Sequence, residues 1–113
     1  MSLKGFIETL RSKPETVKFA DTMQVIEQNY QFVEVAFSNG DVRNNKGENN
    51  GSCKIFSFAQ LNKLPESQTL SCFGEYYQDV LATPDGDDHQ NIRNFIQHGW
   101  SGIAFEAMAL SQK

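Results

Sequence analysis

Residues 85–95 carry the densest group of side chains that could do chemistry. They read DGDDHQNIRNF and hold three aspartates, a histidine, an arginine and two asparagines. A calcium loop is excluded because its sixth position is Gly and its twelfth is Glu, whereas this stretch places Gln90 and Ile96 there. Asp87 and Asp88 stand just before an apolar helical face, which predicts that they cap a helix and complement its dipole.

The remaining polar residues of this stretch fit two interpretations. His89 precedes Ile92 by three residues, so it shares the apolar face of the predicted helix and is expected to be a hydrogen-bonded core residue. In that case the stretch holds the chain's own backbone in place, because its side chains satisfy the backbone groups of a nearby loop. The alternative is a binding face formed by His89, Gln90, Asn91, Arg93 and Asn94.

Cys53 is the candidate nucleophile of the chain. It lies in NNGSCK, residues 49–54, where the first turn of a predicted helix and Lys54 create the positive potential that stabilises a thiolate. Cysteine proteases combine such a thiol with a later histidine and asparagine, and His89 and Asn91 follow in that order. We favour a packed, unreactive thiol, since free cysteine is among the most buried residue types.

A polar segment, residues 38–52, is the second candidate binding surface. It holds a single apolar side chain, Val42, among five asparagines and three glycines. Such a composition predicts a solvent-exposed loop or a frayed ribbon, and loops of this length are often functional. The candidate contacts for a partner are Asn39, Arg43, Asn49 and Asn50 in this segment, together with Trp100 further along the chain.

The first half of the chain is expected to place two helices before a hairpin. Apolar residues at i, i+3, i+4 and i+7 predict a helix over residues 3–10. The S-x-x-E pattern of residues 12–15 predicts a capping box that opens a second helix over residues 19–30. Alternating side chains over residues 33–37 then predict a strand, and Asn39-Gly40 suits a tight hairpin turn.

The second half is expected to be mainly helical. Apolar side chains suit a buried helix over residues 55–61 and another over residues 70–81, inside which Gly74 indicates a close backbone contact. The helix that carries the 85–95 stretch is expected to end at Gly99. The string WSGIAF, residues 100–105, could then return as a short strand beside the hairpin.

These elements predict one α+β domain over residues 1–113, mostly helical, with a small antiparallel sheet built from the hairpin and a C-terminal strand. The chain has 39% hydrophobic residues and a net charge of −4. Its Lys and Arg form no stripe and no apolar run could cross a bilayer, so we expect neither nucleic acid nor membrane as a partner. The two cysteines fit reduced thiols, and we expect no metal and no cofactor.

Several strings of the chain together resemble one known family. They are FSNGD at 37–41, NNGSCKIFSFA at 49–59, FGEYY at 73–77, VLATPDGDDHQNIRNF at 80–95 and GWSGIAF at 99–105. In this order the chain resembles the HopJ family of type III effector proteins. The resemblance implies a protein that plant-pathogenic bacteria deliver into host cells, although similar proteins occur in bacteria with no evident plant host. It assigns no catalytic role to any residue of this chain.

Two functions are compatible with the sequence and with this resemblance. One is an effector-like, non-enzymatic module that binds a protein partner, which would be a host protein if the chain is secreted. The other is a small enzyme or small-ligand binder that uses Cys53, His89 and Arg93 in the bacterial cytoplasm. Type III signals resemble disordered segments, whereas residues 3–10 have an apolar helical face. We therefore expect the bacterial cytoplasm, with type III secretion into a host cell as the alternative.

Overall fold

The computed structural model describes residues 2–113 and combines helices with two small antiparallel sheets. Its first half consists of α1 (Leu3–Ser12), the 3-10 helix η1 (Pro14–Thr16), α2 (Phe19–Asn29), β1 (Tyr30–Phe32), β2 (Phe37–Asn39) and β3 (Val42–Asn44). Its second half consists of α3 (Asn50–Leu61), α4 (Glu66–Ser71), α5 (Glu75–Ala82), α6 (Gln90–His98), η2 (Gly99–Gly102), β4 (Ile103–Phe105) and β5 (Leu110–Gln112). Across residues 2–113, no helix is both long and apolar enough to cross a membrane.

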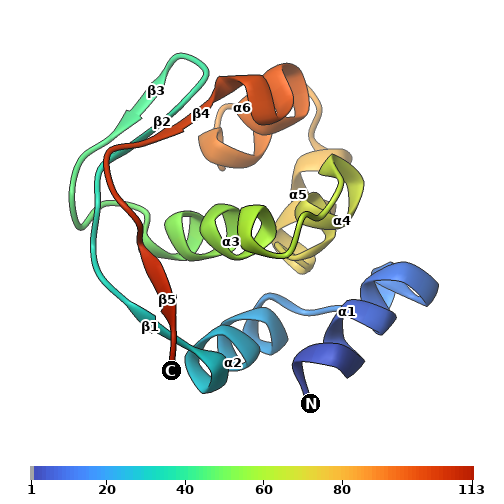
Figure 1. The fold of residues 1–113 in the computed structure, drawn as a ribbon. Helices are drawn as coiled ribbons and strands as arrows, with labels where there is room; N and C mark the ends of the chain where they lie inside the picture. The colour runs from blue at the N-terminus through green and yellow to red at the C-terminus, as the bar shows by residue number, and fades with distance from the viewer. Residues whose placement is uncertain (1) are drawn as a thin grey trace.

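The two sheets are parts of one long antiparallel ribbon (Figure 1). Strand β1 pairs with β5, and β2 pairs with both β3 and β4. Between these pairs the two chain segments stay joined by the Val33 amide, which donates to Ala109 at 2.8 Å, and by the Glu106 amide, which donates to Ala36 at 3.1 Å. The C-terminal segment, residues 103–112, is thereby joined to residues 30–39.

Helix α3 crosses the middle of the molecule, with α6 and the β2–β3 hairpin on one side and α1 and α2 on the other (Figure 1). Its position explains its apolar sequence, because both sides of it must be covered. Phe56 and Phe58 of α3 are fully buried. The Phe56 ring lies 5.0 Å from that of Phe95 on α6, and the Phe58 ring lies 5.9 Å from that of Phe6 on α1. Phenylalanine packing therefore joins the two sides of the fold through α3.

The predicted helix over residues 70–81 is two helices, α4 and α5, with Gly74 between them. Gly74 has φ +59°, and a Cβ at this position would overlap the backbone nitrogen of Phe19. A side chain is therefore excluded both by the backbone conformation and by the contact. The expected close backbone contact at Gly74 is confirmed, and the same glycine breaks the helix.

Two other predictions about elements need correction. Ser12 does not begin a capping box; it ends α1, where its hydroxyl donates to Glu8. Helix α2 begins at Phe19, and the amide of the preceding Lys18 donates to the Asp21 carboxylate at 3.1 Å. The segment predicted as a strand, residues 33–37, lies mostly between β1 and β2, and Val33 in it is 59% exposed.

The polar segment of residues 38–52 is more ordered than its composition predicts. It contains the end of β2, the turn, all of β3 and the first residues of α3, which leaves only residues 45–49 as a connection. The expected hairpin turn is confirmed, since Asn39 pairs with Val42 across Gly40 and Asp41. Asn39 and Asn44 are fully buried. The α+β class is confirmed, as is a strand beside the hairpin at β4.

Candidate functional site

Four asparagines beneath the hairpin form one hydrogen-bonded group, which we call the asparagine cluster: Asn39, Asn44, Asn49 and Asn91. The Asn91 amide donates to Asn44 at 2.9 Å, and its oxygen accepts from Asn44 at 3.1 Å and from Asn39 at 3.1 Å. The Asn39 amide also donates to the backbone oxygen of Asn91 at 2.7 Å. Asn49 completes the group by donating to Asn44 at 2.7 Å. The start of α6 is thereby bonded to β2, β3 and the connection before α3.

The asparagine cluster agrees with the expectation that this polar stretch holds the chain's own backbone. Asn91 donates one hydrogen bond to the hairpin side chains and accepts two from them, so its amide is bonded mainly within the fold. Asn39 was expected to contact a partner, but it is fully buried and a partner cannot reach it. Asn94 is also buried, and its amide donates to the Gln90 backbone oxygen at 2.9 Å.

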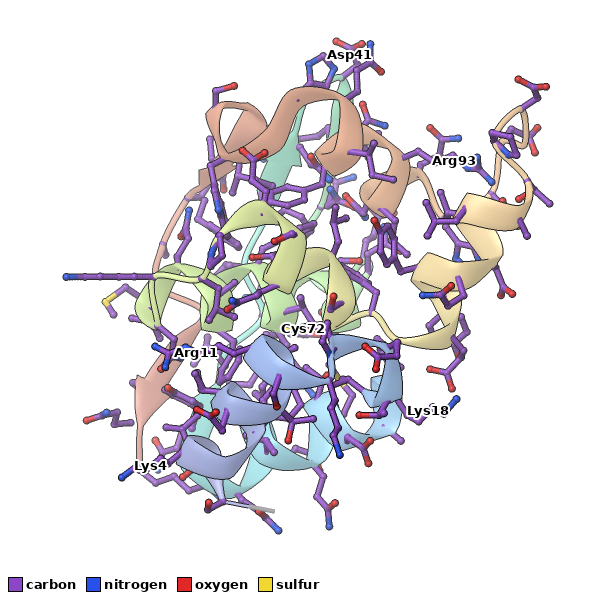
Figure 2. All side chains as sticks on the ribbon, turned by 90° about the vertical axis from the view of Figure 1, so that its right-hand side faces the viewer. Lys4, Arg11, Lys18, Asp41, Cys72 and Arg93 are labelled. Atoms are coloured by element: carbon purple, nitrogen blue, oxygen red, sulfur yellow. The ribbon has the colours of Figure 1, made fainter. Side chains whose placement is uncertain are left out.

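Arg93 stabilises the connection between α5 and α6 and lies beside it (Figure 2). Its guanidinium donates to the backbone oxygen of Thr83 at 2.7 Å and to the Asp88 carboxylate at 2.6 Å. It donates as well to the backbone oxygen of Asp88. The Arg93 hydrogen bond is the main reason why the pKa of Asp88 falls below its ordinary value. Arg93 thus closes the connection onto the start of α6, and its side chain is only 13% exposed.

The start of α6 differs from the prediction. Asp87 and Asp88 do not cap the helix; the N-cap residue is His89, which has φ 50° and makes no side-chain capping bond. His89 does not join the buried face with Ile92 either, because its side chain is 30% exposed. Its ring lies 5.4 Å from that of Tyr76, and its Nε2 lies 3.9 Å from a carboxylate oxygen of Asp79. The left-handed backbone at residue 89 turns the side chain away from the core.

Cys53 does not have the environment of a catalytic thiol. It is fully buried, and its thiol points to the backbone oxygen of Val35 at 3.9 Å. Burial raises the pKa of Cys53, which is opposite to the shift that the thiolate of a catalytic cysteine requires. The prediction of a stabilised thiolate at this helix start is therefore wrong. Cys72 is buried as well, and burial raises its pKa to about 12.

An open groove runs between the starts of α3 and α6, with a volume of about 360 Å³. We call it the α3–α6 groove. Three ring side chains, Phe19, Tyr76 and His89, line it, together with the buried Phe73 and Ile92. Its other lining residues are Val42, Asn49, Gly51, Ser52, Gln90 and Asn91. Of the residues singled out from the sequence, the groove unites Asn49, His89, Gln90 and Asn91, whereas Cys53 and Arg93 do not line it.

The Phe19 and Tyr76 rings are the part of the groove that the sequence did not reveal. The Phe19 and Tyr76 rings lie 5.0 Å apart, and Tyr76 is 40% exposed although it is aromatic. The Glu75 carboxylate accepts from the Phe19 amide at 2.8 Å and so joins the start of α5 to the start of α2. The string FGEYY contained the signal, but only the turn at Gly74 brings these residues beside Phe19.

The remaining candidate binding residues lie outside the groove. Arg43 pairs with the exposed Glu106 of the neighbouring ribbon segment. Asn50 donates to the Glu34 carboxylate at 2.9 Å. Trp100 is half-buried, and its indole donates to the backbone oxygen of Leu64 at 3.3 Å. Each of these three side chains bonds to a different segment of the chain. Over residues 2–113, no group of three or more His, Cys, Asp or Glu is placed to hold a metal ion.

Fold and groove together define a small α+β domain whose polar residues brace a hairpin and whose aromatic side chains line a surface groove. The model of the HopJ type III effector protein family matches residues 3–110, and the chain belongs to this family. The chain is also similar to a crystal structure of VPA0580, a protein of unknown function, with a TM-score of 0.98 and 54% sequence identity. That similarity covers 100% of this chain and 95% of the other. A comparison with curated proteins gives no match.

Proposed function

We propose that this HopJ-family protein is a non-enzymatic binding module and that a protein partner docks in the α3–α6 groove. The observation that carries the proposal is a row of rings along an open groove, in which Tyr76 is exposed and Phe19 and His89 are half-buried. Aromatic side chains supply much of the energy of protein interfaces, because they bury a large rigid area at a small cost in conformational entropy. Family membership supports an effector-like role but assigns no activity.

The polar residues near the groove support binding over catalysis. Asn91 and Arg93 bond to neighbouring parts of the chain and hold the hairpin and the α5–α6 connection. Cys53 is buried outside the groove and has a raised pKa. A catalytic base needs its nucleophile within hydrogen-bonding reach, and the groove places His89 beside Tyr76 and Asp79 instead. The rival set of Cys53, His89 and Arg93 therefore does not share one cavity.

Small-ligand binding is the second candidate function, and the size of the groove favours it. Its volume of about 360 Å³ lies within the range of small-molecule sites. A small ligand would contact the same rings and the exposed Gln90 at the start of α6. The two candidate functions differ in whether a protein or a small molecule occupies the groove, so the test must measure the mass of the bound molecule.

Site-specific photo-crosslinking distinguishes these functions. A benzophenone amino acid replaces Tyr76 in the groove or, as a control, Leu81, which is 53% exposed on the same helix but does not line the groove. The variants are irradiated in bacterial cells and in host extract, which also tests both locations. We expect a protein adduct from position 76 alone. Equal adducts from both positions, or none from position 76 in either setting, would contradict a docking role of the groove.

A further inference from the structure

We propose that the partner segment that fits the α3–α6 groove is basic, with a Lys or Arg side chain lying against the Tyr76 and His89 rings and facing Asp79 and Asp88. This inference rests on the proposed function and names the chemistry of its partner. Three features support it: the row of rings, the carboxylates beside it, and the engagement of the nearby arginine within the fold.

The row of rings offers faces that attract a cation. Phe19 and Tyr76 meet nearly edge to face, at 5.0 Å and 68°, and Tyr76 and His89 meet at 5.4 Å and 38°. The face of an aromatic ring carries negative potential, so an ammonium or guanidinium group within about 6 Å of its centre is attracted. The buried Phe73 and Ile92 line the same groove and offer apolar contact to the aliphatic stem of such a side chain.

Two carboxylates stand beside these rings with their charge largely exposed. Asp79 and Asp88 each have an oxygen 3.9 Å from Nε2 of His89, and their side chains are 64% and 63% exposed. Among residues 2–113, the ion-pair contacts of Asp79 are limited to this histidine. An exposed carboxylate this close to the His89 ring adds a second attraction for a cation from a partner.

The arginine nearest to these carboxylates is already engaged within the fold. Arg93 bonds to Thr83 and to one oxygen of Asp88, and its side chain is 13% exposed. Asp85 and Asp87 lie on the same exposed connection and add negative charge. Residues 64–113 hold seven acids against two bases, a net charge of −5. An acidic segment would be repelled here, so the charge favours a basic partner over neutral or acidic ones.

A peptide-display library with random sequences, selected on the whole protein, provides the test. Recovered peptides are synthesised and their affinities are measured by fluorescence anisotropy. Each is then resynthesised with norleucine in place of Lys or citrulline in place of Arg, which removes the charge and keeps the length. The protein variants are Tyr76→Ala, Asp79→Asn and, as a charge-matched control, Glu8→Gln in α1, which lies at the opposite end of the molecule from α6 (Figure 1).

We expect the recovered peptides to be rich in Lys and Arg. Their affinity should fall about fivefold with Asp79→Asn and about fivefold to tenfold with the uncharged peptides, whereas Glu8→Gln should leave it unchanged. Peptides that need Tyr76 but carry no base, or that bind Asp79→Asn as well as the wild type, would overturn the inference and leave the groove as a docking site. Failure to recover any peptide that depends on Tyr76 would overturn the proposed function as well.

Discussion

At the scale of single residues, asparagine side chains fill the buried space beneath the hairpin, where apolar side chains are usually found. Each amide has a donor and an acceptor, so asparagines can satisfy one another where carboxylates would repel. Asn39, Asn44 and Asn91 are buried together, and Asn91 lies at the centre of their bonds. Within residues 38–52, the composition therefore predicted exposure wrongly at Asn39 and Asn44. The signal was hidden because the bonding partners lie 47 to 52 residues apart in the chain.

The asparagine cluster predicts a large effect of Asn91→Ala on stability. The substitution removes three buried side-chain hydrogen bonds to Asn39 and Asn44, and each such bond contributes about 0.5–1.5 kcal/mol. We expect the free energy of unfolding to fall by about 2–4 kcal/mol, measured by urea denaturation. Asn45→Ala, at an exposed neighbour in the connection, should change it by less than about 0.5 kcal/mol. Equal effects of both variants would contradict a structural role for Asn91.

Thiol labelling tests the environment of the two cysteines. Both are fully buried, and burial raises both pKa values, that of Cys72 to about 12. Only the thiolate reacts with iodoacetamide, so both should stay protonated and unlabelled in the folded protein at pH 8 and react quickly once it is unfolded in urea. Mass spectrometry after timed quenching measures this. Labelling of folded Cys53 as fast as that of a free thiol would restore the catalytic interpretation.

At the scale of elements, the connection between α5 and α6 positions the start of α6, which lines the groove. It carries the acids of the 85–95 stretch and ends at His89, and Arg93 holds it through Thr83 and Asp88. The sequence singled out this stretch and gave α6 its correct end at Gly99. It assigned the capping role to the wrong residues, because Asp88 bonds to an arginine five positions later and not to helix amides.

The ion pair of Arg93 and Asp88 predicts a dependence of stability on acid. The pKa of Asp88 is lower in the folded protein than its ordinary value of 3.8, chiefly because Arg93 donates to it. The unfolded chain therefore takes up this proton first as the pH falls, so the pair stabilises the fold above about pH 4 and loses this effect below it. Asp88→Asn should flatten the decline in melting temperature below pH 4. An unchanged decline in this variant would contradict the pairing.

Gly74 predicts that the break between α4 and α5 cannot accept a side chain. Its φ of +59° is unfavourable for alanine, and the added Cβ would overlap the backbone at Phe19. Gly74→Ala should lower the free energy of unfolding by about 2–4 kcal/mol. Ser71→Ala, near the end of α4 with an exposed hydrogen bond to Ser67, is the control and should change it by less than about 1 kcal/mol. A folded Gly74→Ala protein of wild-type stability would show that the break tolerates a side chain.

At the scale of the whole molecule, the sequence predicted the class of fold but not the strand pairing that joins the C-terminal segment to β1. Helices α1, α2, α3 and α6 and strand β4 were predicted from the local pattern, whereas α4 and α5 were predicted as one helix. The pairing of β1 with β5 was not predicted, because it joins short segments with little alternation that lie far apart in the chain. The groove was missed for the same reason: Phe19 and Tyr76 come from separate helices and meet only through the backbone contact at Gly74.

Charge is also arranged at this scale. Residues 1–29, which form α1 and α2, hold four bases and four acids and are neutral overall, whereas Asp41 lies beside α6 at the other end of the molecule (Figure 2). The acids of residues 79–88 lie on α5 and on the connection that leads to α6. A basic partner would therefore be oriented toward the groove by the field of the whole molecule, and its binding should weaken as salt is added.

The most direct measurement of the central claim is the affinity of the crosslinked partner for the Tyr76→Ala variant, with Leu81→Ala as control. Both side chains are exposed on α5, and Tyr76 alone lines the groove. Loss of an aromatic side chain at the centre of an interface costs about 2 kcal/mol or more, so we predict at least a tenfold loss of affinity for Tyr76→Ala and none for Leu81→Ala. Undiminished binding by a folded Tyr76→Ala protein would show that the partner docks elsewhere.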